Sequence, residues 1–243
     1  MKRIMNNNIL IFGDLHAPYQ HKDTLEFLSL LNESFNLDRI ICTGDMLDQY
    51  PLSRFPKSPS AENVIVELKK AKKVVAKLAE LFPRMDIVKS NHCERLYQKA
   101  AVGGIPREFL IPYMELIGAP EGWNMYDDLS ITIDATRQQL YVAHTKTGTP
   151  KQCAGRLASN VAFGHNHNKL GIEYISNPKQ SFFGADVGCL ISDKGYPFGY
   201  NKGTLIRPTR GVLIVAEGMP LSIHMDTFMK LYRKSLKQER LEV

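Results

Sequence analysis

Five short polar segments of the chain bring together aspartate, asparagine and histidine in a pattern that suits metal binding. They are GDLH (13–16), GDMLD (44–48), SNHCE (90–94), AHT (143–145) and GHNH (164–167). The donor side chains in these segments are Asp14, His16, Asp45, Asp48, Asn91, His92, His144, His165 and His167. A set that is rich in carboxylate and imidazole and poor in thiolate favours borderline or hard divalent ions such as Mn, Fe, Zn or Mg over a structural zinc site.

These donor side chains can bind metal ions together only if the five segments lie close to one another in the folded chain. An aspartate can bridge two ions through its two oxygens, which is how proteins hold metals about 3.5 to 4 Å apart for attack on phosphorus. Taken singly, each segment has an ordinary alternative, because a Gly-Asp pair or a lone histidine is usually a cap, a turn or a satisfied core residue. The order of all five together favours the metal hypothesis.

The elements that precede these segments would carry them to one place. The stretches NNILIFGDLH (7–16), DRIICTGDMLD (38–48) and MDIVK (85–89) each contain an apolar run with the composition of a buried strand that leads into a polar segment. A helix that follows Asp23 and a long helix over 61–82, with Ser60 as its N-cap, separate these strands. Strand, helix and strand in this order predict parallel pairing, which places the polar segments at one edge of the sheet.

The rest of the chain predicts a helical stretch at 107–117 followed by short strands. The expected strands cover 129–134, 139–144, 161–164, 170–175, 181–187 and 211–216. No linker, repeat or low-complexity segment divides the sequence, so we expect a single domain over residues 1–243.

Size and composition restrict the class of protein. The 243 residues are 44% hydrophobic, which is enough for a sizeable core, and no apolar run has the length of a signal peptide core or a membrane span. The four cysteines are widely spaced and predict reduced thiols. We therefore expect a cytoplasmic protein with no membrane partner. The formal charge of +6 and the pI near 9.0 favour a polyanionic partner.

The order and spacing of the five segments resemble those of calcineurin-like metallophosphoesterases. In that family D-x-H, G-D-x-x-D, G-N-H-[D/E], a lone H and G-H-x-H follow one another, and the match here runs from residue 12 to residue 167. The resemblance implies an α/β (α+β) four-layer sandwich, in which helices flank two mixed β-sheets. It also implies a dinuclear site at the strand ends and hydrolysis of phosphoesters by a metal-bridging hydroxide.

The resemblance also implies a role for each residue at a matching motif position. One ion would be held by Asp14, His16, Asp45 and His167, and the second by Asp45, Asn91, His144 and His165, with Asp45 as the bridge. His92 matches the histidine beside the leaving-group oxygen, and Asp48 matches the acid that orients it. A carboxylate on one ring nitrogen would raise the pKa of this histidine and keep its far nitrogen protonated. The expected cofactors are two divalent ions, Mn²⁺ first, with Fe, Zn, Ni or Mg as alternatives.

The sequence departs from the family pattern near the third segment. Ser90 stands where the family has glycine, which is compatible with a negative φ, and Cys93 stands where it has an acid, with Glu94 next in sequence as a partial replacement. The phosphate-binding cation of some family members is also missing from its usual position. Arg95 and Arg54 are candidates to replace this cation in binding the substrate, although most arginines simply lie on the protein surface.

We therefore predict a hydrolase of phosphomonoesters or phosphodiesters, with nucleotides or nucleic acid as favoured substrates. Two alternatives stay open. The first is a DNA or RNA nuclease of the same superfamily, with a basic tail that contacts phosphates through Lys230, Arg233, Lys234, Lys237 and Arg240. The second is a non-catalytic scaffold that keeps the fold and the metal. The sequence does not fix the natural substrate or the oligomeric state.

Overall fold

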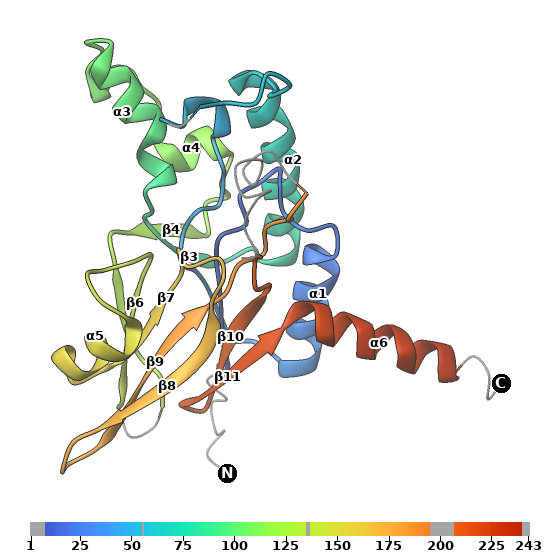
Figure 1. Ribbon diagram of the computed structural model, residues 1–243, viewed down its shortest axis with the longest axis vertical. Coiled ribbons are helices and arrows are strands. Elements are labelled where there is room, and N and C mark those ends of the chain that lie inside the picture. The colour runs from blue at the N-terminus through green and yellow to red at the C-terminus, as the bar shows by residue number, and fades with distance from the viewer. Residues whose placement is uncertain (1–7, 55, 135–136, 195–206, 240–243) are drawn as a thin grey trace.

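Two β-sheets form the centre of the molecule, as the computed structural model in Figure 1 shows for residues 8–54, 56–134, 137–194 and 207–239. The six-stranded sheet has the order β11-β10-β1-β2-β3-β4, and the five-stranded sheet has the order β5-β6-β7-β9-β8. The first contains β1 (Asn8–Phe12), β2 (Arg39–Cys42), β3 (Met85–Val88), β4 (Trp123–Tyr126), β10 (Gly211–Ala216) and β11 (Met219–His224). The second contains β5 (Leu129–Thr132), β6 (Gln139–Ala143), β7 (Asn160–Phe163), β8 (Leu170–Ser176) and β9 (Ser181–Val187).

Both sheets are mixed, and each has a parallel centre. Strands β1, β2, β3 and β4 pair in parallel, whereas β10 and β11 join the sheet antiparallel. In the second sheet β6, β7 and β9 are parallel, and β5 and β8 are antiparallel to their neighbours. Because parallel strands end on the same side, the loops after β1, β2 and β3 share one edge, and so do the loops after β6 and β7.

The two sheets pack face to face through a core of aliphatic residues. Strand β1 shows how the sequence builds it, since successive side chains of a strand point to opposite faces. Ile9 and Ile11 enter the core between the sheets, which also contains Val142 and Val187 of the second sheet. The alternate residues, including Phe12, face the helices instead. Buried on both faces, β1 therefore consists almost entirely of apolar residues.

Helices cover the outer faces of both sheets. Helices α1 (Thr24–Phe35), α2 (Val64–Leu81) and α6 (Met225–Glu239) supply apolar residues to the core on the outer side of the six-stranded sheet. Helix α5 (Pro150–Leu157) packs on the five-stranded sheet through Cys153 and Ala154. The predicted four-layer sandwich of two mixed sheets flanked by helices is thus confirmed. Among the described residues, no helix has the length and apolar character needed to cross a membrane.

Several short helices lie beyond the carboxyl ends of the strands, near the polar loops (Figure 1). They are α3 (Arg95–Val102), α4 (Tyr113–Ile117) and three 3₁₀ turns, η1 (Tyr50–Leu52), η2 (His92–Glu94) and η3 (Arg107–Phe109). The helical stretch expected at 107–117 is therefore two separate pieces, and α3 was not expected. Pro112 separates the two pieces, because the residue before a proline avoids the helical region, and Pro106 precedes the first piece.

The start of α2 differs from the expectation. Ser60 was the predicted cap, but the helix begins at Val64, and the side chain of Asn63 accepts hydrogen bonds from the backbone amides of Ile65 and Val66. Asparagine caps as well as serine does, and its amide oxygen satisfies two otherwise unpaired N–H groups here.

Candidate metal centre

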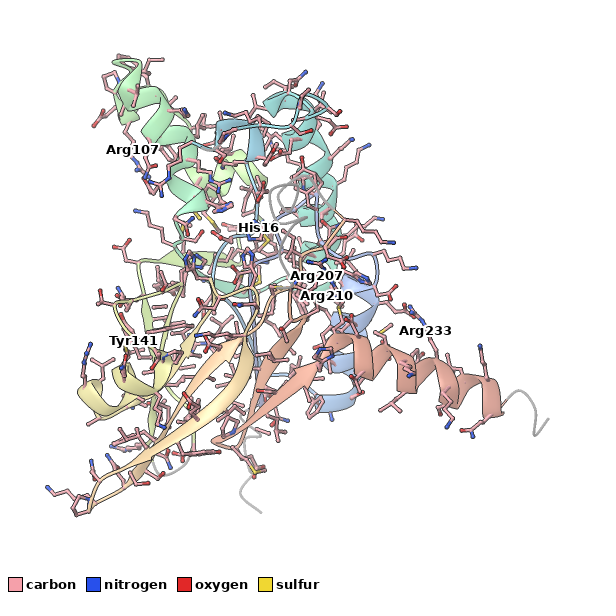
Figure 2. The ribbon with its side chains drawn as sticks, viewed as in Figure 1. His16, Arg107, Tyr141, Arg207, Arg210 and Arg233 are labelled. Carbon is pink, nitrogen blue, oxygen red and sulfur yellow. The ribbon has the colours of Figure 1, made fainter. Side chains whose placement is uncertain are left out.

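The five polar loops meet at the carboxyl ends of parallel strands from the two sheets. The loops after β1, β2 and β3 supply Asp14, Asp45 and Asn91 from the six-stranded sheet. The loops after β6 and β7 supply His144 and the pair His165 and His167 from the five-stranded sheet. His16 lies near the middle of the molecule, between the short helices and the strands (Figure 2).

One group of potential metal ligands consists of Asp14, His16, Asp45 and His167, whose ligand atoms all lie within 4.8 Å of one another. Nε2 of His16 is 3.0 Å from Nε2 of His167, which is itself 3.0 Å from Oδ1 of Asp14. Oδ2 of Asp45 is 3.5 Å from the same nitrogen of His16. Asp14, His16 and Asp45 are buried, and His167 is half-buried.

A second group consists of Asp45, His144 and His165, again within 4.8 Å of one another. Nε2 of His144 is 3.1 Å from Nδ1 of His165, 2.8 Å from Oδ1 of Asn91 and 3.5 Å from Oδ2 of Asp45. Nδ1 of His144 donates a hydrogen bond to the carbonyl oxygen of Thr43, at 2.9 Å. This bond fixes the tautomer and leaves Nε2 as the electron-pair donor toward the centre.

Asp45 is the residue that the two groups share. Its Oδ2 lies about equally far from the ring nitrogens of His16 and His144, at 3.5 Å in both cases. Such a position suits a bridging carboxylate between two ions. The structure brings the predicted ligands together, and a third group of potential ligands, His16, Asp48 and His92, shares His16 with the first.

Burial and charge oppose each other in this cluster. Burial alone would raise the pKa of Asp14, but hydrogen bonds with His16 and His167 hold it well below its usual value. Burial likewise works to raise the pKa of Asp45, and nearby histidines, His92 and His144 foremost, keep it at about 2. Burial lowers the pKa of His16, yet hydrogen bonds with Asp14 and Asp48 raise it to about 10. Buried carboxylates therefore need positive charge around them, which a divalent ion held by these side chains would supply.

The backbone at the centre is held in an uncommon conformation. Asp14, His16, Asp45 and His165 have φ angles of 51°, 49°, 48° and 70°, in the left-handed region. Each non-glycine residue in this region costs about 1 to 3 kcal/mol, and such residues cluster at functional sites. The loops also approach closely, because a Cβ atom on Gly164 would lie 2.7 Å from Oδ2 of Asp14. Glycine is needed at this position for the loop after β7 to reach the aspartate.

His92 has partners that differ from the expected ones. Its Nδ1 donates to the backbone oxygen of Asp48 at 2.7 Å, whereas Oδ1 of the Asp48 carboxylate accepts from Nδ1 of His16 at 2.7 Å. Nη2 of Arg95 lies 2.6 Å from Nε2 of His92 and must be the donor, because a guanidinium has no acceptor. Burial and nearby cations, including Arg95, lower the pKa of His92 to about 4. These hydrogen bonds suit a His92 ring that donates through Nδ1 and accepts from Arg95 through Nε2.

Ser90 and Cys93, the two residues of the third segment that differ from the family pattern, have different effects on the site. Oγ of Ser90 accepts a hydrogen bond from the backbone amide of Asp45 at 2.9 Å and lies 3.2 Å from Sγ of Cys93. Ser90 therefore helps to fix the shared aspartate, a contact that glycine could not make. Burial raises the pKa of Cys93, which keeps the thiol neutral. Glu94 does not replace a carboxylate at the centre, because it forms ion pairs with Lys89 and Arg107.

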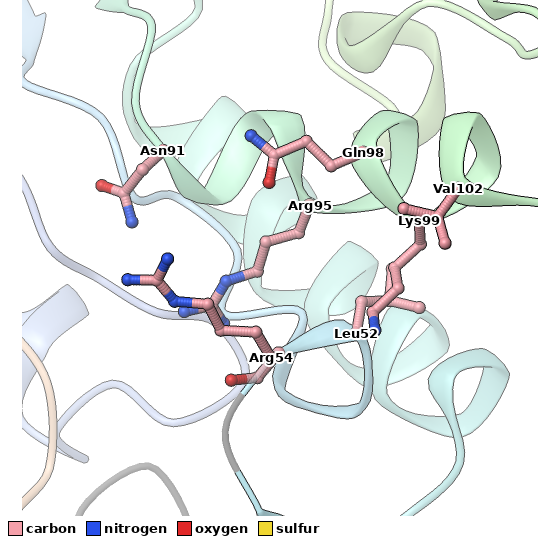
Figure 3. Close-up of a pocket in the computed structure, with 8 residues that line it drawn as sticks. Leu52, Arg54, Asn91, Arg95, Gln98, Lys99 and Val102 are labelled. Atoms are coloured by element: carbon pink, nitrogen blue, oxygen red, sulfur yellow. The ribbon is translucent and has the colours of Figure 1, made fainter.

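The two candidate substrate arginines line one pocket of about 370 Å³ beside Asn91 (Figure 3). Arg54 reaches it from the loop after η1, and Arg95 reaches it from the first turn of α3. Sequence reasoning missed Lys99 and Gln98, which also line the pocket. Arg95 and Lys99 are four residues apart and so share a face of α3, a signal that becomes visible only once the helix itself is recognised.

Comparison of the sequence with family models and with curated proteins gives no match. Comparison with solved structures does give matches. Vacuolar protein sorting 29 from Cryptosporidium parvum is 14% identical, covers 90% of this chain and 96% of its own, and has a TM-score of 0.43. The E. coli phosphoesterase YfcE is 13% identical over 90% and 94% of the chains, with a TM-score of 0.44. Pseudomonas putida nuclease MPE is 13% identical over 88% and 87%, with a TM-score of 0.33. At this level of similarity, function has to be inferred from the site.

Proposed function

We propose that this protein hydrolyses phosphoesters with two divalent metal ions, of which Mn²⁺ is the first choice. The observation that carries the proposal is the pair of ligand groups that share the buried Asp45. One ion would be held by Asp14, His16, Asp45 and His167, and the other by Asp45, Asn91, His144 and His165. Oxygen and imidazole donors without thiolate fit ions of this type.

When bound, the two ions would lower the pKa of an attacking water and neutralise the oxygens of the phosphoryl group. The residues of the chain then have separate tasks. Asp48 positions His16 through the hydrogen bond to Nδ1, and Thr43 positions His144 through its carbonyl oxygen. Such contacts orient metal ligands and adjust their basicity.

His92 and Arg95 lie next to the ligand Asn91 and form the adjacent side of the site. The guanidinium of Arg95 is held by the backbone oxygen of Asp48 and by His92, both at 2.6 Å. We propose that Arg95 provides positive charge toward the substrate phosphate. His92 can donate a proton to a leaving group only after Arg95 gives up its bond to Nε2. The position of Arg95 therefore determines whether Nε2 of His92 can carry a proton when substrate binds.

The charge of +6 supports nucleotides or nucleic acid as the substrate class. The basic residues of α6 do not give this idea further support. Arg233 forms ion pairs with Asp23, the N-cap residue of α1, and with Glu26 in its first turn, and α6 extends away from the polar loops in Figure 1. Arg240 lies outside the described residues.

An assay with p-nitrophenyl phosphate and bis-p-nitrophenyl phosphate tests the proposal and also separates monoesterase from diesterase activity. The purified protein is stripped with EDTA and reloaded with Mn²⁺, Fe²⁺, Ni²⁺, Zn²⁺ or Mg²⁺. We expect metal-dependent release of nitrophenol in wild type and none in Asp45→Asn. No turnover with any of the five ions, in a protein that still binds them, would favour a metal-binding scaffold instead.

A further inference from the structure

We propose that the pocket beside Asn91 binds a second phosphate group of the substrate, joined by a short linker to the phosphate at the metal centre. The substrate class would then be organic phosphates with two phosphates close together, as in a nucleoside bisphosphate or a short nucleic-acid strand. This inference rests on the proposed function, because it assumes that a first phosphate occupies the centre.

The pocket adjoins the candidate metal centre at Asn91. Asn91 lines it, and Oδ1 of Asn91 lies 2.8 Å from Nε2 of His144 in the second ligand group. Arg95 also lines it and bonds to His92. When one phosphate of a substrate lies beside Asn91 at the centre, the rest of the substrate can therefore enter the pocket next to Arg95.

The pocket carries an excess of positive charge. Arg54, Arg95 and Lys99 line it, with the amide of Gln98 as a further donor, and among the described residues no carboxylate lines it. Oδ2 of Asp48, which does not line the pocket, lies 4.0 Å from Nη1 of Arg95. Guanidinium groups bind phosphate oxygens through paired hydrogen bonds, and an ammonium adds a point charge.

A second pocket on the other side of Asn91 provides a comparison. It has a volume of about 260 Å³, and its lining includes Lys89 and Lys146. Here acids lie close to both lysines, because Lys89 is 3.1 Å from Glu94 and Lys146 is 3.1 Å from Asp128. Glu94 and Asp127 themselves line this pocket, whereas among the described residues no carboxylate lines the pocket of Arg54, Arg95 and Lys99, so an anionic group favours the latter.

The size and walls of the cationic pocket also fit the ligand. Its volume of about 370 Å³ is far larger than one phosphate needs, and Leu52 and Val102 provide an apolar surface at its edge (Figure 3). A sugar or another linker can lie against these side chains while the phosphate meets the cations.

The test compares substrates that differ by one phosphate. In the nucleotide arm, thymidine 3′,5′-bisphosphate is compared with both thymidine monophosphates. In the nucleic-acid arm, the dinucleotide pTpT is compared with TpT. We expect kcat/KM to be at least about tenfold higher for the substrate with the extra phosphate in one or both arms, since charge-assisted hydrogen bonds are the strong ones. The arm with the larger preference identifies the source of the substrate.

The variants Lys99→Gln and Lys99→Glu should reduce this preference, with the larger loss for the reversed charge. Lys99 is exposed, so neither variant should unfold the protein. Lys77→Gln is the matched control, because Lys77 is an exposed lysine of α2 that does not line the pocket, and it should keep the preference. Equal kcat/KM with and without the extra phosphate in both arms, or a preference that both Lys99 variants retain, would overturn the inference. Failure to hydrolyse any of these substrates or the nitrophenyl esters would instead contradict the proposed function.

Discussion

Asp45 belongs to both ligand groups, so its replacement should affect both ions. The substitution Asp45→Asn keeps the shape of the side chain and removes the charge that two cations would share. We expect wild type to hold about two ions per chain and the variant to hold less than one, measured by elemental analysis after dialysis against Mn²⁺. In contrast, His165→Ala and His167→Ala should each retain about one ion, because each removes a ligand from only one group. Two ions in all three variants would contradict the assignment.

The Asp48 carboxylate accepts a hydrogen bond from His16 at 2.7 Å, and its Oδ1 lies farther from Nδ1 of His92, at 3.6 Å, while the backbone oxygen of Asp48 accepts from that nitrogen. We therefore expect Asp48→Asn to weaken metal affinity by about 10- to 100-fold, the usual effect of losing a group that orients a ligand. A competition titration with a fluorescent chelator measures this. Glu94→Gln is the control, because that carboxylate pairs with Lys89 and Arg107 outside the centre. If Asp48→Asn left metal affinity unchanged but shifted the pH profile of kcat, the main role of the Asp48 carboxylate would be to orient His92 and not His16.

For single residues, the sequence shows which residue types the loops carry but not which side chains hydrogen-bond to each other. Asp14, His16 and Asp45 can be placed at strand ends from the apolar runs before them. The bond from His16 to Asp48 and the bond from Arg95 to His92 depend on side-chain directions after a left-handed turn, and no local pattern encodes these. The contact of Ser90 with the amide of Asp45 is likewise visible only in three dimensions.

At the scale of elements, helix α2 is linked to the site loops by a buried carboxyl group. Glu67 accepts hydrogen bonds from the hydroxyl of Tyr19 at 3.0 Å and from the backbone amide of Tyr50 at 3.1 Å. Burial, with help from the nearby charge of Asp48, raises its pKa to about 7. Periodicity predicted α2 as an amphipathic helix, but it could not show that one acidic residue of this helix faces inward.

The raised pKa of Glu67 gives a signed prediction for stability. The folded state holds the proton more tightly than the unfolded state, so this contribution is fully present below about pH 4.5 and is lost as the pH rises through about 7. Glu67→Gln should therefore gain unfolding free energy relative to wild type by up to about 1.4 kcal/mol per pH unit across this window. Urea unfolding in EDTA at several pH values measures the difference. Glu80→Gln, an exposed change on the same helix, should show no such trend.

Strands and helices were predictable where their periodicity was undisturbed. The strand expected at 181–187 corresponds to β9, and the one at 211–216 corresponds to β10. In contrast, β4 and α3 were missed. Strand β4 is short and gains its stability from parallel pairing with β3 and from Trp123, whose ring nitrogen donates to the carbonyl oxygen of Phe82 at 2.8 Å. Pairing of this kind is a tertiary effect that overrides local propensity.

At the scale of the whole molecule, the candidate ligands come from both sheets. Asp14, Asp45 and Asn91 follow strands of the six-stranded sheet, whereas His144, His165 and His167 follow strands of the five-stranded sheet. The apolar core between the sheets was foreseeable from the alternating and fully apolar strands. The sequence alone could not show that bound metal would link the two sheets, because this depends on which sheet each ligand belongs to. Each proposed ion would connect one sheet to the other.

Metal binding should therefore stabilise the whole fold and not one loop. A ligand that binds only the folded state adds about 2.7 kcal/mol when its free concentration is 100 times its Kd, so Mn²⁺ should raise the thermal midpoint and EDTA should reverse the shift. Amide hydrogen exchange should slow at the carboxyl ends of both β1 and β7, since the ligands after these strands are drawn together. Asp45→Asn should show neither the thermal shift nor the slower exchange. Protection confined to one sheet would mean that the ions do not connect the two, and that the ligand groups deduced from the geometry are wrong.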